Sequence, residues 1–130
     1  MSRQTVVEGL TLLYVIVVTL LSTIKLSPNV PMADVVGIDK VVHIMFYFVL
    51  NMLLLLVFSQ RGFIVKYSSV VWVTLCSIGY GCLMEVIQHF TGRQCSVLDI
   101  AANSIGAVIA LALFRYTFIA SCFEQFVRGK

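Results

Sequence analysis

Four long apolar stretches, separated by short polar segments, run through this chain of 130 residues. A helix needs about 20 apolar residues to cross the hydrocarbon core of a membrane, and the four stretches reach or approach that length. Hydrophobic residues make up 60% of the chain and charged residues 12%, a composition that a water-soluble domain of this size could not bury. The sequence therefore predicts one all-α domain, an integral membrane four-helix bundle. The predicted transmembrane helices cover about 6–24, 41–58, 68–90 and 100–122.

The basic residues indicate how the bundle is oriented, because Lys and Arg accumulate in cytoplasmic loops. Six of the nine fall on the side that holds both termini: Arg3, Arg61, Lys66, Arg115, Arg128 and Lys130. The other three are Lys25, Lys40 and Arg93. We therefore expect both termini in the cytoplasm. The second and fourth helices would then begin at the outer face.

Other classes of protein find little support in the sequence. The net charge is only +3, and the basic residues are scattered rather than gathered into a stripe, so no nucleic-acid partner is expected. The four cysteines form no Cys-x-x-Cys pair, which favours packing over metal binding or a disulfide framework. The sequence does not indicate an oligomeric state.

Polar residues recur on three of the predicted helices, close to their outer ends. Residues three or four apart share one helix face, which gives three stripes: Asp39, His43 and Tyr47; Ser77, Gly81, Glu85 and Gln88; Asp99, Asn103 and Gly106. Glu85 would lie roughly 7–8 Å below the end of its helix. A charge at the centre of a membrane costs about 2.5–3.5 kcal/mol, and buried polar groups need partners. We therefore expect these stripes to meet in one shallow pocket under the outer surface.

Three local expectations follow from the same helices. Asp39 and Asp99 stand at natural N-cap positions, where they could satisfy free backbone N–H groups or face a ligand. Asn51 is expected to drift toward the edge of the polar face of its helix. The Ala102-x-x-x-Gly106 spacing would let another helix approach closely, and the first helix is expected to act as a supporting wall.

Two segments, "DKVVHIMFYFVL" and "MEVIQHFTGRQCSVLDIAANSIGA", carry a family resemblance. They resemble the two signatures of VanZ-like membrane proteins, Asp-Lys-x-x-His-x-x-x-Tyr and Glu-x-x-Gln, Gly-Arg, Asp-x-x-x-Asn-x-x-Gly. The matching positions are Asp39, Lys40, His43, Tyr47, Glu85, Gln88, Gly92, Arg93, Asp99, Asn103 and Gly106. With the helix spacing, the resemblance covers about residues 10 to 120. It implies a multi-pass protein of the bacterial cytoplasmic (inner) membrane, linked to resistance against teicoplanin-type lipoglycopeptides, without an assigned reaction.

Two kinds of function remain open. In the first, an outer-face site takes the headgroup of an anionic lipid or lipid-linked envelope precursor, with or without turning it over. The expected binding residues are Arg93, Lys40, Gln88, Asn103 and Tyr47, and the candidate catalytic residues are Glu85, His43, Asp39 and Asp99. A divalent cation could bridge these carboxylates to phosphate, although the sequence names no metal. No nucleophile is evident.

In the second, the polar cluster only locks the helices together. The protein would then bind lipid, or the acyl tail of a lipoglycopeptide, without changing it. Transport is the least favoured function, because four short helices make a small pore.

Overall fold

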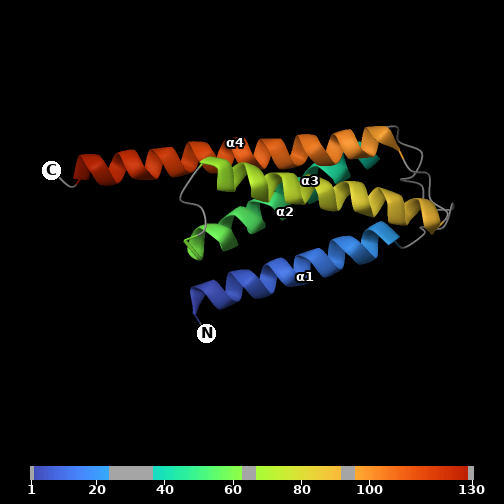
Figure 1. The fold of residues 1–130 in the computed structure, drawn as a ribbon, viewed down its shortest axis with the longest axis horizontal. Helices are drawn as coiled ribbons and strands as arrows, with labels where there is room; N and C mark the ends of the chain where they lie inside the picture. The colour runs from blue at the N-terminus through green and yellow to red at the C-terminus, as the bar shows by residue number, and fades with distance from the viewer. Residues whose placement is uncertain (1, 24–36, 63–66, 92–95, 129–130) are drawn as a thin grey trace.

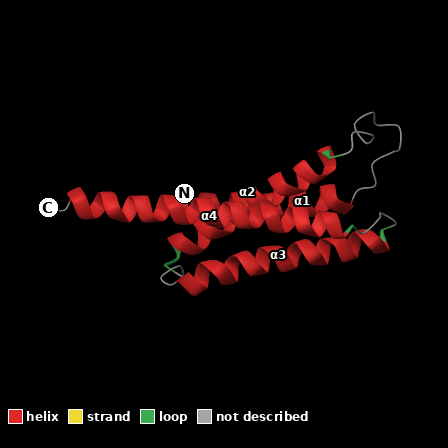
Figure 2. Cartoon of the chain, turned by 90° about the horizontal axis from the view of Figure 1, so that it is seen from above, coloured by secondary structure: helices red, strands yellow, loops and turns green. Residues whose placement is uncertain are grey.

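The computed structural model describes residues 2–23, 37–62, 67–91 and 96–128. They form four α-helices: α1 (Arg3–Thr23), α2 (Ile38–Gln60), α3 (Tyr67–Phe90) and α4 (Val97–Arg128). Figure 2 shows no strand within these described segments. Each helix is long and apolar enough to cross a membrane, over Gln4–Thr23, Ile38–Gln60, Ser68–Phe90 and Val97–Thr117. The prediction of an all-α protein with four membrane-spanning helices is therefore confirmed.

The helices alternate in direction along the bundle (Figure 1). Both chain ends consequently lie at one end of the bundle, where α2 ends and α3 begins. We call this the Arg61 end, and we call the opposite end, where α2 and α4 begin, the Asp39 end. The alternation agrees with termini on a common side, and the assignment of that side to the cytoplasm stays a prediction.

The pair α2 and α4 forms the most extensive helix contact in the bundle. Gly106 of α4 lies against the backbone of α2, and a Cβ atom at this position would overlap with the carbonyl oxygen of Ile44. The same Cβ would also lie 3.0 Å from the backbone nitrogen of Phe48. Only glycine allows so close a backbone approach. The Ala102-x-x-x-Gly106 spacing thus indicated the contact correctly.

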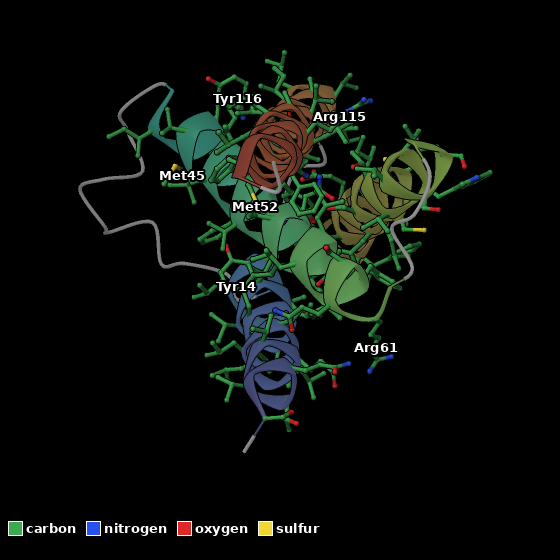
Figure 3. The ribbon with its side chains drawn as sticks, turned by 90° about the vertical axis from the view of Figure 1, so that its left-hand side faces the viewer. Tyr14, Met45, Met52, Arg61, Arg115 and Tyr116 are labelled. Atoms are coloured by element: carbon green, nitrogen blue, oxygen red, sulfur yellow. The ribbon has the colours of Figure 1, made fainter. Side chains whose placement is uncertain are left out.

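Helix α1 lies at the edge of the bundle, against α2 and, to a smaller extent, α3. Tyr14 lies where α1 meets α2 (Figure 3), and its hydroxyl donates to the carbonyl of Phe46 at 3.1 Å. Thr19 shares a hydrogen bond of 2.6 Å with the hydroxyl of Tyr80. These contacts fit the supporting role expected for the first helix.

The interior changes character along the bundle. Near the Arg61 end it is apolar, with a cluster of Leu55, Val70, Val73 and Phe114. From the level of this cluster to the Asp39 end, buried polar side chains accompany the buried apolar ones: Asn51, Thr74, Ser77, Glu85, Gln88, Asp99 and Asn103. Large apolar side chains such as Leu12 and Trp72 are exposed on the outside. Apolar exteriors with inward-facing polar groups are typical of proteins whose helices contact lipid.

The two aspartates do not occupy the N-cap positions expected from the sequence. Helix α2 starts one residue before Asp39, after Gly37, which has a φ of 108° and makes no side-chain cap hydrogen bond. Glycine adopts this left-handed conformation without steric cost, so the chain can enter the helix early. Helix α4 starts at Val97, and the carbonyl of Ser96 accepts from the N–H of Asp99 at 3.0 Å. Both aspartates therefore lie inside the first helical turn.

Helix α4 is also longer than predicted. It continues to Arg128, whereas the predicted helix ended at about 122. In Figure 1 the end of α4 accordingly extends past the other helices.

Candidate functional site

An ion-pair network joins α2 to α4 at the Asp39 end. The ammonium group of Lys40 contacts Asp39 Oδ2 at 2.8 Å and also pairs with Asp99 Oδ1. The side chain of Asp99 is only 9% exposed, while those of Lys40 and Asp39 are 33% and 57% exposed. The network thus runs from the surface into the bundle. First-turn aspartates also lie near the partial positive charge of a helix N-terminus, which favours them there.

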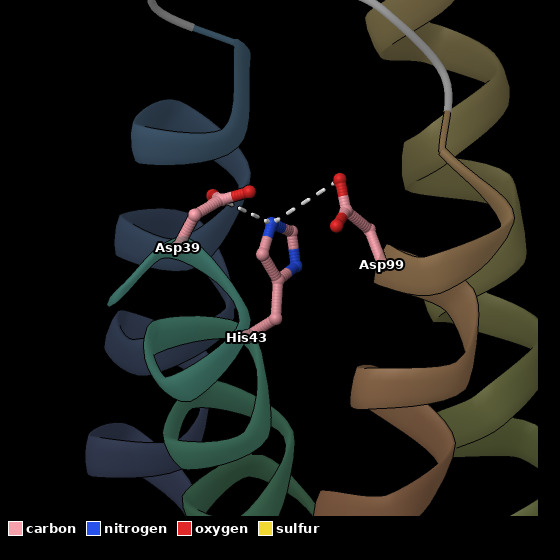
Figure 4. Close-up of side chains that lie close together, drawn as sticks. All are labelled: Asp39, His43 and Asp99. Carbon is pink, nitrogen blue, oxygen red and sulfur yellow. Dashed lines mark ion pairs between the residues drawn. The ribbon is translucent and has the colours of Figure 1, made fainter. Parts of the chain in front are cut away.

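His43 lies between the two aspartates (Figure 4). Its Nε2 atom is 3.6 Å from Asp39 Oδ1 and 4.0 Å from Asp99 Oδ2. Its Nδ1 atom is 2.9 Å from Asn103 Oδ1. Each aspartate thus presents one oxygen to Lys40 and the other to His43. We call these five residues, Asp39, Lys40, His43, Asp99 and Asn103, the acid–base cluster.

The predicted stripes of α2 and α4 therefore do meet. Two features of the sequence bring them together. Polar residues are spaced four apart on each helix, and successive helices alternate in direction, so α2 and α4 both begin at the Asp39 end. Lys40 was expected as a point charge for phosphate rather than as a bridge between carboxylates. Its pairing depends on how α2 and α4 face each other, which spacing along one helix does not specify.

Glu85 of α3 is 1% exposed. Its Oε2 atom accepts from the backbone N–H of Ser96, the residue before α4, at 3.4 Å. Glu85 therefore joins α3 to the start of α4, less than one helical turn from Asp99. Within the described residues, no ion pair links it directly to His43. Gln88, one turn further along α3, is also buried at 2% exposure.

Tyr47 and Gly81 connect the acid–base cluster to α3. A Cβ atom at Gly81 would lie 3.0 Å from Tyr47 Cε1 and 3.3 Å from the Cβ of Asn103, so three helices meet at this glycine. Tyr47 and Asn103 are each 2% exposed. The Tyr47 hydroxyl and the Asn103 Nδ2 have no hydrogen-bond partner among the described atoms. Buried polar atoms of this kind usually bind water or a ligand.

Asn51 was placed wrongly by the sequence analysis. It is fully buried rather than at the edge of its helix face. Its Nδ2 donates to Thr74 Oγ1 at 3.1 Å and to the carbonyl of Ala107 at 2.8 Å, which joins α2, α3 and α4. Two spacings could have indicated this: Asn51 follows Tyr47 by four residues, and Thr74 precedes Ser77 by three.

Arg93, the strongest phosphate-binding candidate of the sequence analysis, lies outside the described residues, as does Gly92. Its role stays a prediction. Within the described residues, Lys40 supplies a positive charge at the Asp39 end.

The family model described as VanZ/LLP1 matches residues 3–120, nearly the whole chain. The match confirms the resemblance drawn from the two signature segments. No curated protein and no solved structure shows a significant match.

Proposed function

This chain belongs to the VanZ/LLP1 family, and from that membership we propose that its acid–base cluster binds the headgroup of an anionic membrane lipid or of a lipid-linked envelope precursor. The observation that carries the proposal is the position of the cluster. Charged and hydrogen-bonding side chains gather in the first turns of two membrane-spanning helices, where lipid headgroups begin. In this proposal the membrane is the bacterial cytoplasmic membrane, and the Asp39 end faces outward.

The start of α2 offers contacts for a phosphate. Its N-cap, Gly37, provides no side-chain acceptor, and the dipole at a helix N-terminus favours an anion. Lys40 adds a positive charge whose side chain is one-third exposed. Arg93 is the second cation in this proposal, since a guanidinium can hold two phosphate oxygens at once.

The carboxylates suit the other part of such a headgroup. Sugar hydroxyls and amines are hydrogen-bond donors, and an ionised carboxylate only accepts. Asp39, with a side chain 57% exposed, is the more accessible of the two acids. A cluster that contains both charges therefore fits a headgroup that combines phosphate with hydroxyl or amine groups, as lipid-linked saccharides do.

If the headgroup is also turned over, proton transfer would fall to His43, Glu85, Asp39 and Asp99. An imidazole has one nitrogen that can accept a proton and one that can donate it, which suits an acid–base role. Tyr47, Gln88 and Asn103 would orient the bound group. The shallow pocket expected from the sequence stays part of this proposal.

A structural lock is the second candidate, and the Lys40 bridge favours it. An ion pair between α2 and α4 holds two helices together whether or not a ligand binds. The protein would then bind lipid, or the acyl tail of a lipoglycopeptide, without any reaction. In either case, protection against teicoplanin-type drugs is the cellular effect that family membership suggests.

Lipid analysis of purified protein tests the proposal. Protein extracted in mild detergent is analysed by mass spectrometry for co-purifying lipids, beside the variants Lys40→Gln and Arg61→Gln. The two side chains are matched, because each is a cation paired with a carboxylate at one end of α2. We expect the wild type and Arg61→Gln to retain an anionic lipid above its share of the membrane, and Lys40→Gln to lose most of it.

Identical lipid profiles for the three proteins would contradict the proposal. So would a wild-type profile that matches the bulk membrane. Circular dichroism and gel filtration confirm that each variant is folded before its lipids are compared.

A further inference from the structure

We propose that Asp39, His43 and Asp99 form a binding site for one divalent first-row metal ion such as Mn²⁺. Each side chain has one possible ligand atom, a carboxylate oxygen or an imidazole nitrogen, and these three atoms lie within 4.8 Å of one another. The inference concerns the acid–base cluster. The metal site itself does not depend on the proposed function. Only the further step, in which a headgroup phosphate completes the coordination of the ion, rests on it.

The distances suit a metal ion. Carboxylate oxygens and imidazole nitrogens bind such ions at roughly 2.0–2.2 Å, so two ligand atoms of one ion stand roughly 3–4 Å apart. His43 Nε2 lies 3.6 Å from the Asp39 oxygen and 4.0 Å from the Asp99 oxygen that face it. An imidazole together with carboxylates favours first-row ions over Mg²⁺ and Ca²⁺, which prefer oxygen ligands alone.

The neighbouring residues hold the three ligands in place. Asn103 Oδ1, 2.9 Å from His43 Nδ1, accepts the proton of that nitrogen and leaves Nε2 with its lone pair. A histidine that binds metal through one nitrogen commonly donates from the other in this way. Lys40 takes the second oxygen of each carboxylate, Asp39 Oδ2 at 2.8 Å and Asp99 Oδ1. A lone pair and two anionic oxygens then face one another, an arrangement that a cation stabilises.

Asn103 supplies an independent observation. It is 2% exposed, and its Nδ2 has no hydrogen-bond partner among the described atoms although its Oδ1 lies against His43. A buried donor beside the imidazole requires an acceptor. A water in the second coordination shell of the ion would supply such an acceptor.

A metal ion also reconciles the acids with an anionic headgroup. In the described part of the acid–base cluster, two carboxylates accompany one ammonium, and a carboxylate near a phosphate opposes its binding. A divalent ion reverses this balance. With three protein ligands, it keeps open positions for a phosphate oxygen. The ion would thus be the contact through which Asp39 and Asp99 help to bind an anion.

Manganese titration tests the site. Tag-free protein is stripped with a chelator and placed in nanodiscs of zwitterionic lipid, which avoids binding of Mn²⁺ to anionic lipid. Mn²⁺ is preferred to Zn²⁺ because thiols, which this chain also contains, bind it poorly. Electron paramagnetic resonance then reports free and bound ion. We expect saturable binding of one ion per chain.

The variants Asp39→Asn and His43→Gln should weaken this binding at least tenfold. Asp39 is largely exposed, so its replacement leaves the fold intact. His89→Ala is the matched control, because His89 is an exposed histidine at the same end of the bundle and should bind as the wild type does. A wild type without saturable binding, or an Asp39→Asn variant that binds unchanged, would overturn the site.

The two proposals fail separately. Bound Mn²⁺ without enrichment of any lipid overturns the headgroup proposal and supports the metal site. Enrichment of an anionic lipid in chelator-treated protein that binds no Mn²⁺ overturns the metal site and supports the headgroup proposal.

Discussion

Lys40 and Asp99, 59 residues apart in the sequence, form an ion pair that joins the first turns of α2 and α4. The carboxylate is largely shielded, with 9% of its side chain exposed, while the ammonium remains one-third exposed. Removal of the Lys40 ammonium would leave the Asp99 carboxylate buried without this opposite charge.

We expect Lys40→Gln to lower the free energy of unfolding by about 1–3 kcal/mol. A fully buried pair loses roughly 3–5 kcal/mol when one partner is removed, and the exposure of Lys40 reduces this. The matched change Arg61→Gln breaks the exposed pair with Glu8 and should cost clearly less, because solvent screens exposed ion pairs. Unfolding of both variants in detergent, compared with the wild type, measures the difference. Equal stabilities of the two variants would contradict the role given to the Lys40 bridge.

Gly106→Ala should reduce the yield of folded protein sharply. The added methyl group would overlap with the Ile44 carbonyl, and because backbone cannot rotate away, α2 and α4 must separate. The loss should exceed the roughly 1–3 kcal/mol of an ordinary overpacked core position. Gly79→Ala is the control, since nothing lies within 4 Å of a Cβ there and alanine favours helix. Fluorescence-detected gel filtration of the two variants gives the comparison.

The hydrogen bond between Asn51 and Thr74 should show energetic coupling. We expect Asn51→Leu and Thr74→Val each to destabilise the bundle, and the double variant to cost less than the sum of the two. Coupling between hydrogen-bonded side chains in membranes averages about 0.6 kcal/mol and reaches about 1.7 kcal/mol. A double-mutant cycle of unfolding free energies measures it. Strict additivity would show that the 3.1 Å contact contributes no stability.

Glu85→Gln separates the proposed site from the structural lock. Glutamine keeps an oxygen that can accept from the Ser96 N–H, so we expect the folded yield to be unchanged. If Glu85 acts in the site, and if the protein protects a susceptible host against teicoplanin as proposed, this protection should be lost. The test compares drug susceptibility with the amount of folded protein in the membrane. Parallel loss of both would favour the lock.

The orientation can be tested with fusions to the C-terminus. With that terminus in the cytoplasm, green fluorescent protein should fluoresce, and alkaline phosphatase should be inactive. The opposite pattern would place the Asp39 end inside the cell and remove the outer-face proposal.

The sequence predicted the helices of this structure better than it predicted the contacts between them. The four helices were predictable because a membrane requires long apolar segments whose backbone bonds are satisfied internally. Their first residues were less predictable, since the early start of α2 depends on the positive φ of Gly37. His43, Asp99 and Asn103 could be brought together from spacing and topology alone. The partners of Asn51, which are Thr74 and Ala107 of two other helices, depend on how the helices face one another, and spacing along α2 does not specify this.

The backbone contact at Gly106 also restricts how this protein can move. Because α4 rests there on the main chain of α2, the two helices can slide or tilt past each other very little. Helix α1 contacts α2 and α3 less extensively than α4 contacts α2, so it is freer to shift. If the tails of a bound lipid enter from the side, we therefore expect them to enter along α1. Helices α2 and α4 would keep their relative position.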